Sequence, residues 1–170
     1  MKGIYILLIS VTKDTSISIG ALGRKDFQEG LYAYVGSAQS NLEKRVERHL
    51  RRVKRKFWHI DYLLSNRQAE VLKVFYKKTG RLEECRVAER LSEIATPLSG
   101  FGSSDCACKS HLFRIEANDH LSEFMREIGV KPFSKMTFVT KTGWSICHVK
   151  VQRWFLPSSG SNIVMFLTAV

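Results

Sequence analysis

Two apolar stretches near the start of the chain decide its fold: GIYILLISV at residues 3–11 and LYAYVGS at residues 31–37. The first is β-branched, aromatic and almost wholly apolar, which is typical of a strand that is buried on both faces. Between them, residues 16–19 alternate as a short strand, and residues 20–30 carry the glycine and charged residues of a loop. The start of the chain therefore predicts a small antiparallel meander.

Helical patterns follow the meander. From the candidate N-cap Asn41, apolar residues recur at helical spacing and predict one long helix: Leu42, Val46, Leu50, Val53 and Phe57. Further helices are expected at residues 58–64, 83–95 and 117–128, and further strands at residues 69–76, 111–115, 136–140 and 149–156. This order predicts an α/β fold of the α+β kind, in which helices flank a small antiparallel sheet.

Length and charge bound the architecture and the class of partner. With 170 residues, 44% of them hydrophobic, the chain has room for one main domain with a real core. The net charge falls from +9 over residues 1–115 to +2 over residues 116–170, so we expect a domain at 1–115 and a C-terminal extension at 116–170. A total charge of +11 favours a polyanionic partner, either nucleic acid or an acidic membrane surface.

The chain shows no sign of membrane insertion or secretion. No apolar run approaches the ~20 residues of a membrane helix, and the apolar N-terminal stretch lacks a cleavage signal, so a cytoplasmic protein is expected. In a reducing compartment the four cysteines are expected as thiols or metal ligands. Cys85, Cys106, Cys108 and His111 could supply four zinc ligands, but one residue between Cys106 and Cys108 is a tighter gap than zinc sites commonly have. The expectation is therefore reduced thiols without metal.

A basic segment marks the surface that would meet a polyanion. Eight of the thirteen residues from Lys44 to Lys56 are Lys or Arg, which is either an ordinary solvated face or a phosphate-binding one. Position favours the second interpretation, because Arg45 and His49 fall beside the apolar stripe of the predicted helix, at the rim of the core. The predicted nucleic-acid contacts are Lys44, Arg48, Arg51, Arg52, Lys54, Arg55, Lys56 and His59. For His59 a hydrogen-bonded role within its helix is the alternative.

Glu84 is the second unusual residue. Helical geometry places it in the middle of the apolar face of the helix at residues 83–95. Burying a carboxylate costs several kcal/mol unless it is paired or binds a cation. Glu84 is therefore either one half of an ion pair or a metal ligand.

These residues together resemble the GIY-YIG nuclease superfamily. Gly3-Ile4-Tyr5 stands on the first strand, Tyr34-Val35-Gly36 on a later one, and Arg45 and His49 follow on a helix four residues apart. Residues 1–115 look closest to a small, largely uncharacterised GIY-YIG-like family, which residues 58–62, 84–85 and 101–113 also match. Several motifs in the right order are stronger support than one tripeptide.

The resemblance implies hydrolysis of phosphodiester bonds in DNA, or in RNA, by a metal-dependent endonuclease, with repair or recombination as candidate settings. It implies that Glu84 binds Mg²⁺ or another divalent cation. Tyr5 or Tyr34 would orient or deprotonate the attacking water, while Arg45 would stabilise charge on phosphorus. His49 would support the tyrosines or relay the proton. The alternative is a binding module that keeps the fold and the basic segment without cleaving.

The sequence departs from the superfamily at two places. Residues 10–30 form a longer excursion between the two tripeptide motifs than is usual. After Pro97 the expected Asn is missing, and Ser104 or Asp105 could replace it.

Overall fold

The computed structural model describes residues 1–116 and 118–133. The strands expected at residues 136–140 and 149–156 lie outside this part of the chain. The described strands are β1 (Gly3–Val11), β2 (Thr15–Ile19), β3 (Gly23–Phe27), β4 (Gly30–Ala38), β5 (Ala69–Lys77), β6 (Thr96–Pro97), β7 (Leu112–Ile115) and β8 (Lys131–Pro132). The described helices are α1 (Leu42–Leu50), α2 (His59–Leu64), α3 (Leu82–Ile94) and α4 (Asn118–Glu127).

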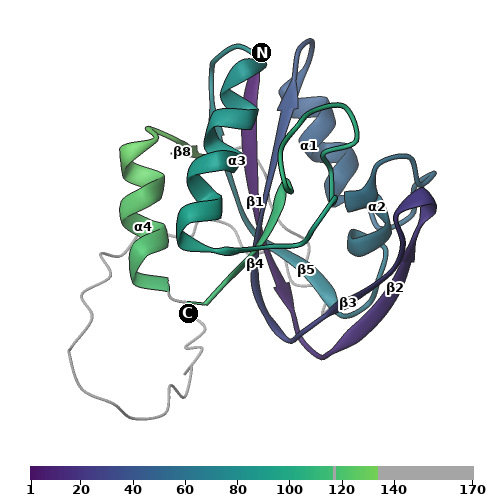
Figure 1. Ribbon diagram of the computed structural model, residues 1–170. Helices are drawn as coiled ribbons and strands as arrows, with labels where there is room; N and C mark the ends of the chain where they lie inside the picture. Colours follow the sequence, from purple (N-terminus) through teal and green to yellow (C-terminus); the bar gives the residue numbers. More distant parts are fainter. Residues whose placement is uncertain (117, 134–170) are drawn as a thin grey trace, which may run out of the picture. The chain divides into compact units, whose positions relative to one another are not determined.

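The strand β1 lies inside a six-stranded sheet with the order β6-β7-β4-β1-β5-β8, in which each pair of neighbours is antiparallel. Figure 1 shows α3 and α4 on one side of this sheet and α1 and α2 on the other. Helices on both faces explain why β1 is apolar at nearly every position. The predicted α+β class, an antiparallel sheet flanked by helices, is confirmed.

Alternate residues of β1 serve the two faces. Ile4 and Ile6 belong to a core that includes Val87 and Leu91 of α3 and Phe124 of α4. On the opposite face, Tyr5 meets His49 of α1. The face toward α1 and α2 thus carries the polar aromatic residues, whereas the face toward α3 and α4 is mainly hydrocarbon.

The excursion between the two tripeptide motifs is a separate hairpin of β2 and β3. The prediction of a loop over residues 20–30 is therefore wrong in its middle, where a short 3-10 turn (Gly20–Leu22) leads into β3. The sequence of β3 shows no apolar alternation, because charged residues occupy its middle: Arg24, Lys25 and Asp26. Only Phe27, at the end of the strand, is buried. A two-stranded ribbon outside the main sheet needs little apolar surface of its own.

The predicted helix from Asn41 to Phe57 is shorter than expected. Asn41 caps its start, accepting a hydrogen bond from the Lys44 amide at 2.8 Å, but α1 ends at Leu50. The prediction is wrong beyond that point: Val53 is 95% exposed and Phe57 is 73% exposed, so their helical spacing has no packing behind it.

The compact unit runs to Ser134, beyond the boundary expected near Glu116. The helix expected at residues 117–128 is present as α4, and this segment contributes four buried side chains to the core: Leu121, Phe124, Met125 and Ile128. A low local charge therefore marks core-facing segments here rather than a new domain. Within the described residues, no helix combines the length and the apolar character that crossing a membrane requires.

Candidate active site

The glycines of the two tripeptide motifs are explained by close approach. A Cβ atom on Gly3 would lie 2.3 Å from the Lys77 carbonyl oxygen, and one on Gly36 would lie 2.4 Å from the Tyr5 hydroxyl. Real Cβ atoms do not approach that closely, so both positions require glycine. Gly36 stands opposite Tyr5 in the β1–β4 register, and the Tyr5 ring lies across it.

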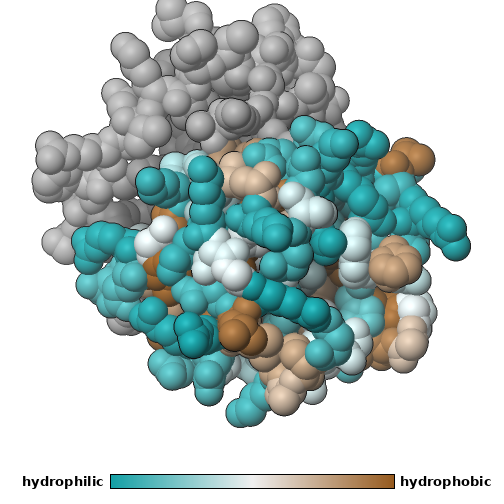
Figure 2. Space-filling view, turned by 90° about the horizontal axis from the view of Figure 1, so that it is seen from above, coloured by the Kyte–Doolittle hydropathy of each residue, from teal (hydrophilic) through white to brown (hydrophobic). Residues whose placement is uncertain are grey.

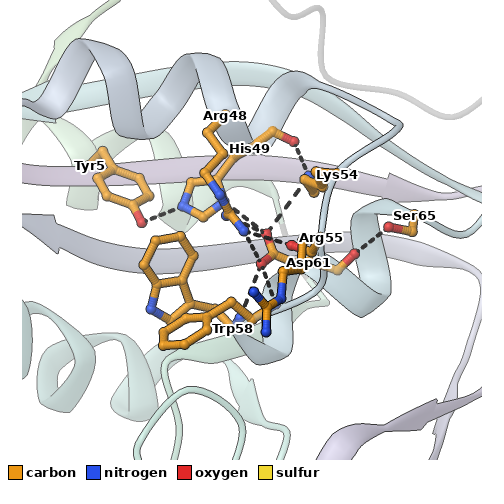
Figure 3. Close-up of polar contacts among 9 residues, drawn as sticks. Tyr5, Arg48, His49, Lys54, Arg55, Trp58, Asp61 and Ser65 are labelled. Atoms are coloured by element: carbon orange, nitrogen blue, oxygen red, sulfur yellow. Dashed lines mark hydrogen bonds and ion pairs between the residues drawn. The ribbon is translucent and has the colours of Figure 1, made fainter.

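A buried chain of polar groups runs from β1 through α1 to α2 (Figure 3). The Tyr5 hydroxyl lies 2.8 Å from His49 Nε2, and His49 Nδ1 lies 3.5 Å from Asp61 Oδ1. All three side chains are almost fully buried. Strand alternation places Tyr5 on the face of β1 toward α1. His49 lies on the buried side of α1, and Asp61 lies in the first turn of α2.

Asp61 is the anchor of this chain, and the sequence patterns did not predict a role for it. Arg48 donates to both carboxylate oxygens at 2.9 Å, and the Phe57 and Trp58 amides donate at 3.0 Å. Burial by itself would raise the pKa of this carboxyl, but the His49 ring, the Arg48 guanidinium and the two amides outweigh it and hold the pKa well below its usual range. Asp61 is therefore a fixed negative charge beneath His49.

The electrostatics favour a neutral relay. Burial lowers the pKa of His49, although Asp61 partly opposes the shift. Burial raises the pKa of Tyr5 well above its ordinary value; Tyr34 and Glu84 raise it further, and Arg45 opposes them. With Nδ1–H toward Asp61, neutral His49 presents Nε2 as an acceptor to the Tyr5 hydroxyl. Both shifts stabilise the neutral pair, and the 2.8 Å contact provides the path along which a proton could pass between Tyr5 and His49.

Tyr34 and Arg45 lie in the same neighbourhood. The Tyr34 ring is 6.3 Å from that of Tyr5 and 6.4 Å from that of His49. The Arg45 guanidinium lies over the Trp58 ring at 4.5 Å from its centroid, and both its charge and a side-chain hydrogen bond act on the Tyr5 hydroxyl. Burial raises the pKa of Tyr34, Glu84 adds to the rise and Arg45 opposes it, so both charges act at this hydroxyl.

Glu84 reaches the site from the other helical layer. It lies in the first turn of α3, accepts a hydrogen bond from the Ser37 hydroxyl, and places Oε1 3.2 Å from His111 Nδ1. β7 pairs with β4 only as far as Tyr34, so the last residues of β4 form an edge around which side chains from both faces can meet. The Glu84 side chain, predicted to point inward, is 16% exposed, and its partners are Ser37 and His111.

The structure divides the predicted nucleic-acid contacts into two groups. Five are exposed, of which Lys56 also lies over the Tyr62 ring at 5.2 Å from its centroid: Lys44, Arg51, Arg52, Arg55 and Lys56. Arg48 is held by Asp61, and His59 Nδ1 accepts a hydrogen bond from the Gly102 amide at 3.0 Å. Lys54 is only 3% exposed and donates to the His49 carbonyl oxygen at 2.5 Å, while burial lowers its pKa to about 8. Arg48, His59 and Lys54 are engaged within the domain, and the basic surface is narrower than predicted.

Apart from Lys44, which lies in α1, the exposed part of the basic segment is the connection between α1 and α2. Its arginines flank the exposed Val53 and Phe57. Figure 2 looks down on the end of the sheet where β1 begins, and this face is mainly hydrophilic with hydrophobic residues in separate patches. An exposed aromatic beside arginines is suited to a nucleic-acid strand, which offers bases to stack and phosphates to pair.

Three cysteines and one histidine form a second cluster next to Glu84. The ligand atoms of Cys85, Cys106, Cys108 and His111 all lie within 4.8 Å of one another, an arrangement that could hold a metal ion. The three cysteines are free thiols. Burial, and then the neighbouring thiols, raise the pKa of Cys108 to about 12. The cluster joins α3 to the connection between β6 and β7, two segments whose convergence spacing alone could not predict.

Comparison with known proteins identifies the family. Residues 4–132 match the model of DUF123, a domain of unknown function. No curated protein and no solved structure matches the chain. The matched residues span β1 to β8 and include the Tyr5–His49–Asp61 chain, Glu84 and the cysteine cluster. The match covers most of the chain, and this protein belongs to the DUF123 family.

Proposed function

We propose that this protein is a metal-dependent endonuclease of GIY-YIG type that hydrolyses phosphodiester bonds in DNA. The observation that carries the proposal is the Tyr5–His49–Asp61 chain with Tyr34, Arg45 and Glu84 around it. A tyrosine, a neutral histidine and a buried carboxylate in series form an acid–base relay, and a guanidinium and a second carboxylate beside it suit a charged phosphate. A purely structural core has no need of this combination.

Tyr5 acts on the attacking water. As the water oxygen approaches phosphorus, the Tyr5 oxygen takes a proton from the water and passes its own proton to His49 Nε2, 2.8 Å away. Asp61 stabilises the imidazolium that results, since its carboxylate faces Nδ1. The leaving oxygen takes a proton from solvent water, and the proton on His49 returns through Tyr5 to solvent. Burial opposes charge on Tyr5 and on His49 and so favours this return to the neutral state.

Arg45 and Tyr34 complete the phosphate side. The Trp58 ring fixes the Arg45 guanidinium, so little side-chain freedom is lost when it pairs with phosphate oxygens. Tyr34 lies beside the same edge of β4 and can orient the water through its hydroxyl. Arg45 stabilises the negative charge that builds up on the phosphoryl oxygens as the bond to the leaving oxygen breaks.

Glu84 is suited to hold the divalent cation that this type of nuclease uses. Its carboxylate is partly exposed and oriented by the Ser37 hydroxyl, and Mg²⁺ is commonly held by one or two carboxylates together with water and substrate phosphate. Bound there, the cation would polarise the phosphate and stabilise the leaving oxygen. Asp105 and Ser104 are the two candidates to replace the missing Asn. Asp105 is paired with Arg81 at the surface, which leaves Ser104 as the candidate.

The competing proposal is a binding module that uses the basic segment without cleaving. It is favoured by the Glu84–His111 pair, because a carboxylate that faces a histidine can serve structure alone. The two proposals predict different results when the Glu84 charge is removed.

The test is Mg²⁺-dependent nicking of plasmid and branched DNA by the wild-type chain and by Glu84→Gln. The substitution keeps the Ser37 contact but removes the charge, so we expect cleavage to fall at least ~10²-fold while DNA affinity stays near wild type. Glu89→Gln is the matched control, since it removes an exposed carboxylate from the same helix. Wild-type protein that binds DNA but never cleaves it would favour the binding module. Glu84→Gln that cleaves normally would show that the nuclease does not hold its cation at Glu84.

A further inference from the structure

The cysteine cluster has the donor set of a structural zinc site. Three thiols and one imidazole converge with their ligand atoms within 4.8 Å of one another. Zinc in proteins is held tetrahedrally by such sets, and three cysteines with one histidine are among the common structural combinations. Soft thiolates also select zinc over Mg²⁺, which prefers oxygen. The cluster therefore differs in kind from the cation site proposed at Glu84.

The orientation of His111 supports a bound metal. Its Nε2 faces the thiols, 3.4 Å from Cys106 Sγ, while its Nδ1 faces Glu84 Oε1 at 3.2 Å. Histidines that bind metals usually donate their other N–H to a carboxylate or carbonyl, which fixes the tautomer and the ring. Nδ1 is buried and, like His49 Nδ1, forms no hydrogen bond of good geometry. A metal at Nε2 would place the proton on Nδ1, toward Glu84.

The ligands come from different parts of the chain, so the one-residue gap between Cys106 and Cys108 does not argue against zinc. Cys106 and Cys108 stand only one residue apart, but Cys85 comes from α3 and His111 directly precedes β7. The ligands thus come from two segments that the fold brings together, so the four ligand positions do not depend on the spacing within one short loop. The Arg81–Asp105 ion pair joins the same two segments beside the cluster.

A disulfide is a poorer account of the same residues. All three thiols are free, and they converge as a group instead of pairing. A disulfide between any two would leave the third thiol and His111 unexplained. A single metal ion uses all four side chains.

We propose that Cys85, Cys106, Cys108 and His111 bind one zinc ion, which fastens the connection between β6 and β7 to the first turn of α3. Through His111 the ion also holds the Glu84 carboxylate at the edge of β4. The proposal goes beyond the nuclease function and does not depend on it, because a binding module would need the same fastening.

The fastened connection has little regular structure to hold it. Gly100 and Gly102 both have φ near +75°, a region that favours glycine, and Phe101 between them is buried against Tyr34. Ser110 adds hydrogen bonds to the Leu98 and Leu112 carbonyl oxygens. A metal that ties this connection to α3 would therefore also steady the wall against which Tyr34 packs.

The experiment measures metal content and thermal stability of the full-length chain after incubation with zinc chloride and removal of free metal. We expect one zinc per chain, and a melting temperature that falls when a chelator is added. Cobalt chloride in place of zinc should give the visible absorption of a tetrahedral, thiolate-bound cobalt ion. Cys106→Ser and Cys108→Ser should each lose the metal and the effect of the chelator. Cys147→Ser is the matched control, since the proposed site is complete without it, and should keep both.

A folded wild-type chain that takes up no zinc and gives no tetrahedral cobalt spectrum would overturn the proposal. So would zinc that is retained in the Cys106→Ser/Cys108→Ser double variant, zinc lost from Cys147→Ser alone, or iron in place of zinc. If the cysteine variants fail to fold, the cobalt spectrum and the chelator effect on the wild-type chain decide. Zinc content unchanged in Glu84→Gln would separate this site from the proposed catalytic cation, whatever the nuclease assay shows.

Discussion

His49 takes a proton from Tyr5 in the proposed relay, which requires the ring to be neutral when the cycle begins. Burial lowers the pKa of His49 below its ordinary value of 6.5, while Asp61, Lys54 and Arg48 also face the ring. Below the lowered pKa the imidazolium cannot accept the proton. Cleavage should therefore be constant near neutrality and fall with falling pH only below ~6.5.

Single-turnover cleavage measured from roughly pH 5 to pH 8 checks this, with DNA affinity followed over the same range. In His49→Gln the acid limb should vanish and the remaining rate should be at least ~10²-fold lower than that of the wild-type chain. Tyr5→Phe should reach a similarly low rate, because it removes the group that meets the water. An acid limb that survives His49→Gln unchanged would place the titrating group elsewhere.

The same three residues of the relay show what sequence can and cannot reveal about a site. Tyr5 and His49 stand in short motifs, and strand alternation and helix angles place them correctly. Asp61 was missed, although it is also a carboxylate on an apolar helical face, among the buried Ile60, Leu63 and Leu64 of α2. Its partners come from residues three to thirteen positions away, and only the folded chain shows that they converge.

At the scale of elements, the end of α1 explains where nucleic acid would bind. The helix stops at Leu50 because Lys54 folds back to the His49 carbonyl and Arg48 is drawn to Asp61 and the Arg55 carbonyl. The spacing of apolar residues carries no information about these side-chain contacts. The helix predicted from that spacing was therefore about two turns too long. The resulting connection presents arginines to solvent.

This connection should carry the salt dependence of DNA binding. Replacing Arg52 and Arg55 with Ala should weaken binding and reduce the slope of log affinity against log salt by about 0.9 for each phosphate that is no longer neutralised. Filter binding or fluorescence anisotropy over a salt series measures the slope.

Lys13→Ala/Arg67→Ala is the matched control, because it removes the same net charge from exposed positions. These two residues flank the end of β1 and the start of β5, at the other end of the sheet from Tyr5. Equal losses of affinity in both double variants would mean that overall charge, and not this connection, attracts the DNA.

At the scale of the whole molecule, the helical and antiparallel character of the fold followed from local patterns, whereas the extent of the domain did not. The charge shift near Glu116 suggested a boundary, but α4 beyond it closes the core over Ile4, Ile6 and Val87. Charge reports on the solvent-facing side of a segment, and the packing of α4 is decided by its apolar side.

The extent of the domain can be tested with two fragments, one that ends at Glu116 and one that ends at Ser134. The shorter fragment lacks Leu121, Phe124, Met125 and Ile128, each of which stabilises the fold by ~1.5–3 kcal/mol through burial. Their combined loss is comparable with the ~5–15 kcal/mol by which a whole domain is stable. It also lacks β8, which pairs with the edge of β5, and Phe133, whose ring packs against that of Tyr76.

We therefore expect the fragment that ends at Ser134 to unfold cooperatively in urea and the fragment that ends at Glu116 to show no cooperative transition. Circular dichroism and tryptophan fluorescence should report the same midpoint for the longer fragment, since both probes would follow one core. Phe124→Ala in the longer fragment provides an intermediate case, with a loss of ~3–5 kcal/mol from a single cavity. A fragment ending at Glu116 that unfolds cooperatively at the midpoint of the longer one would show that α4 only covers a core already complete without it.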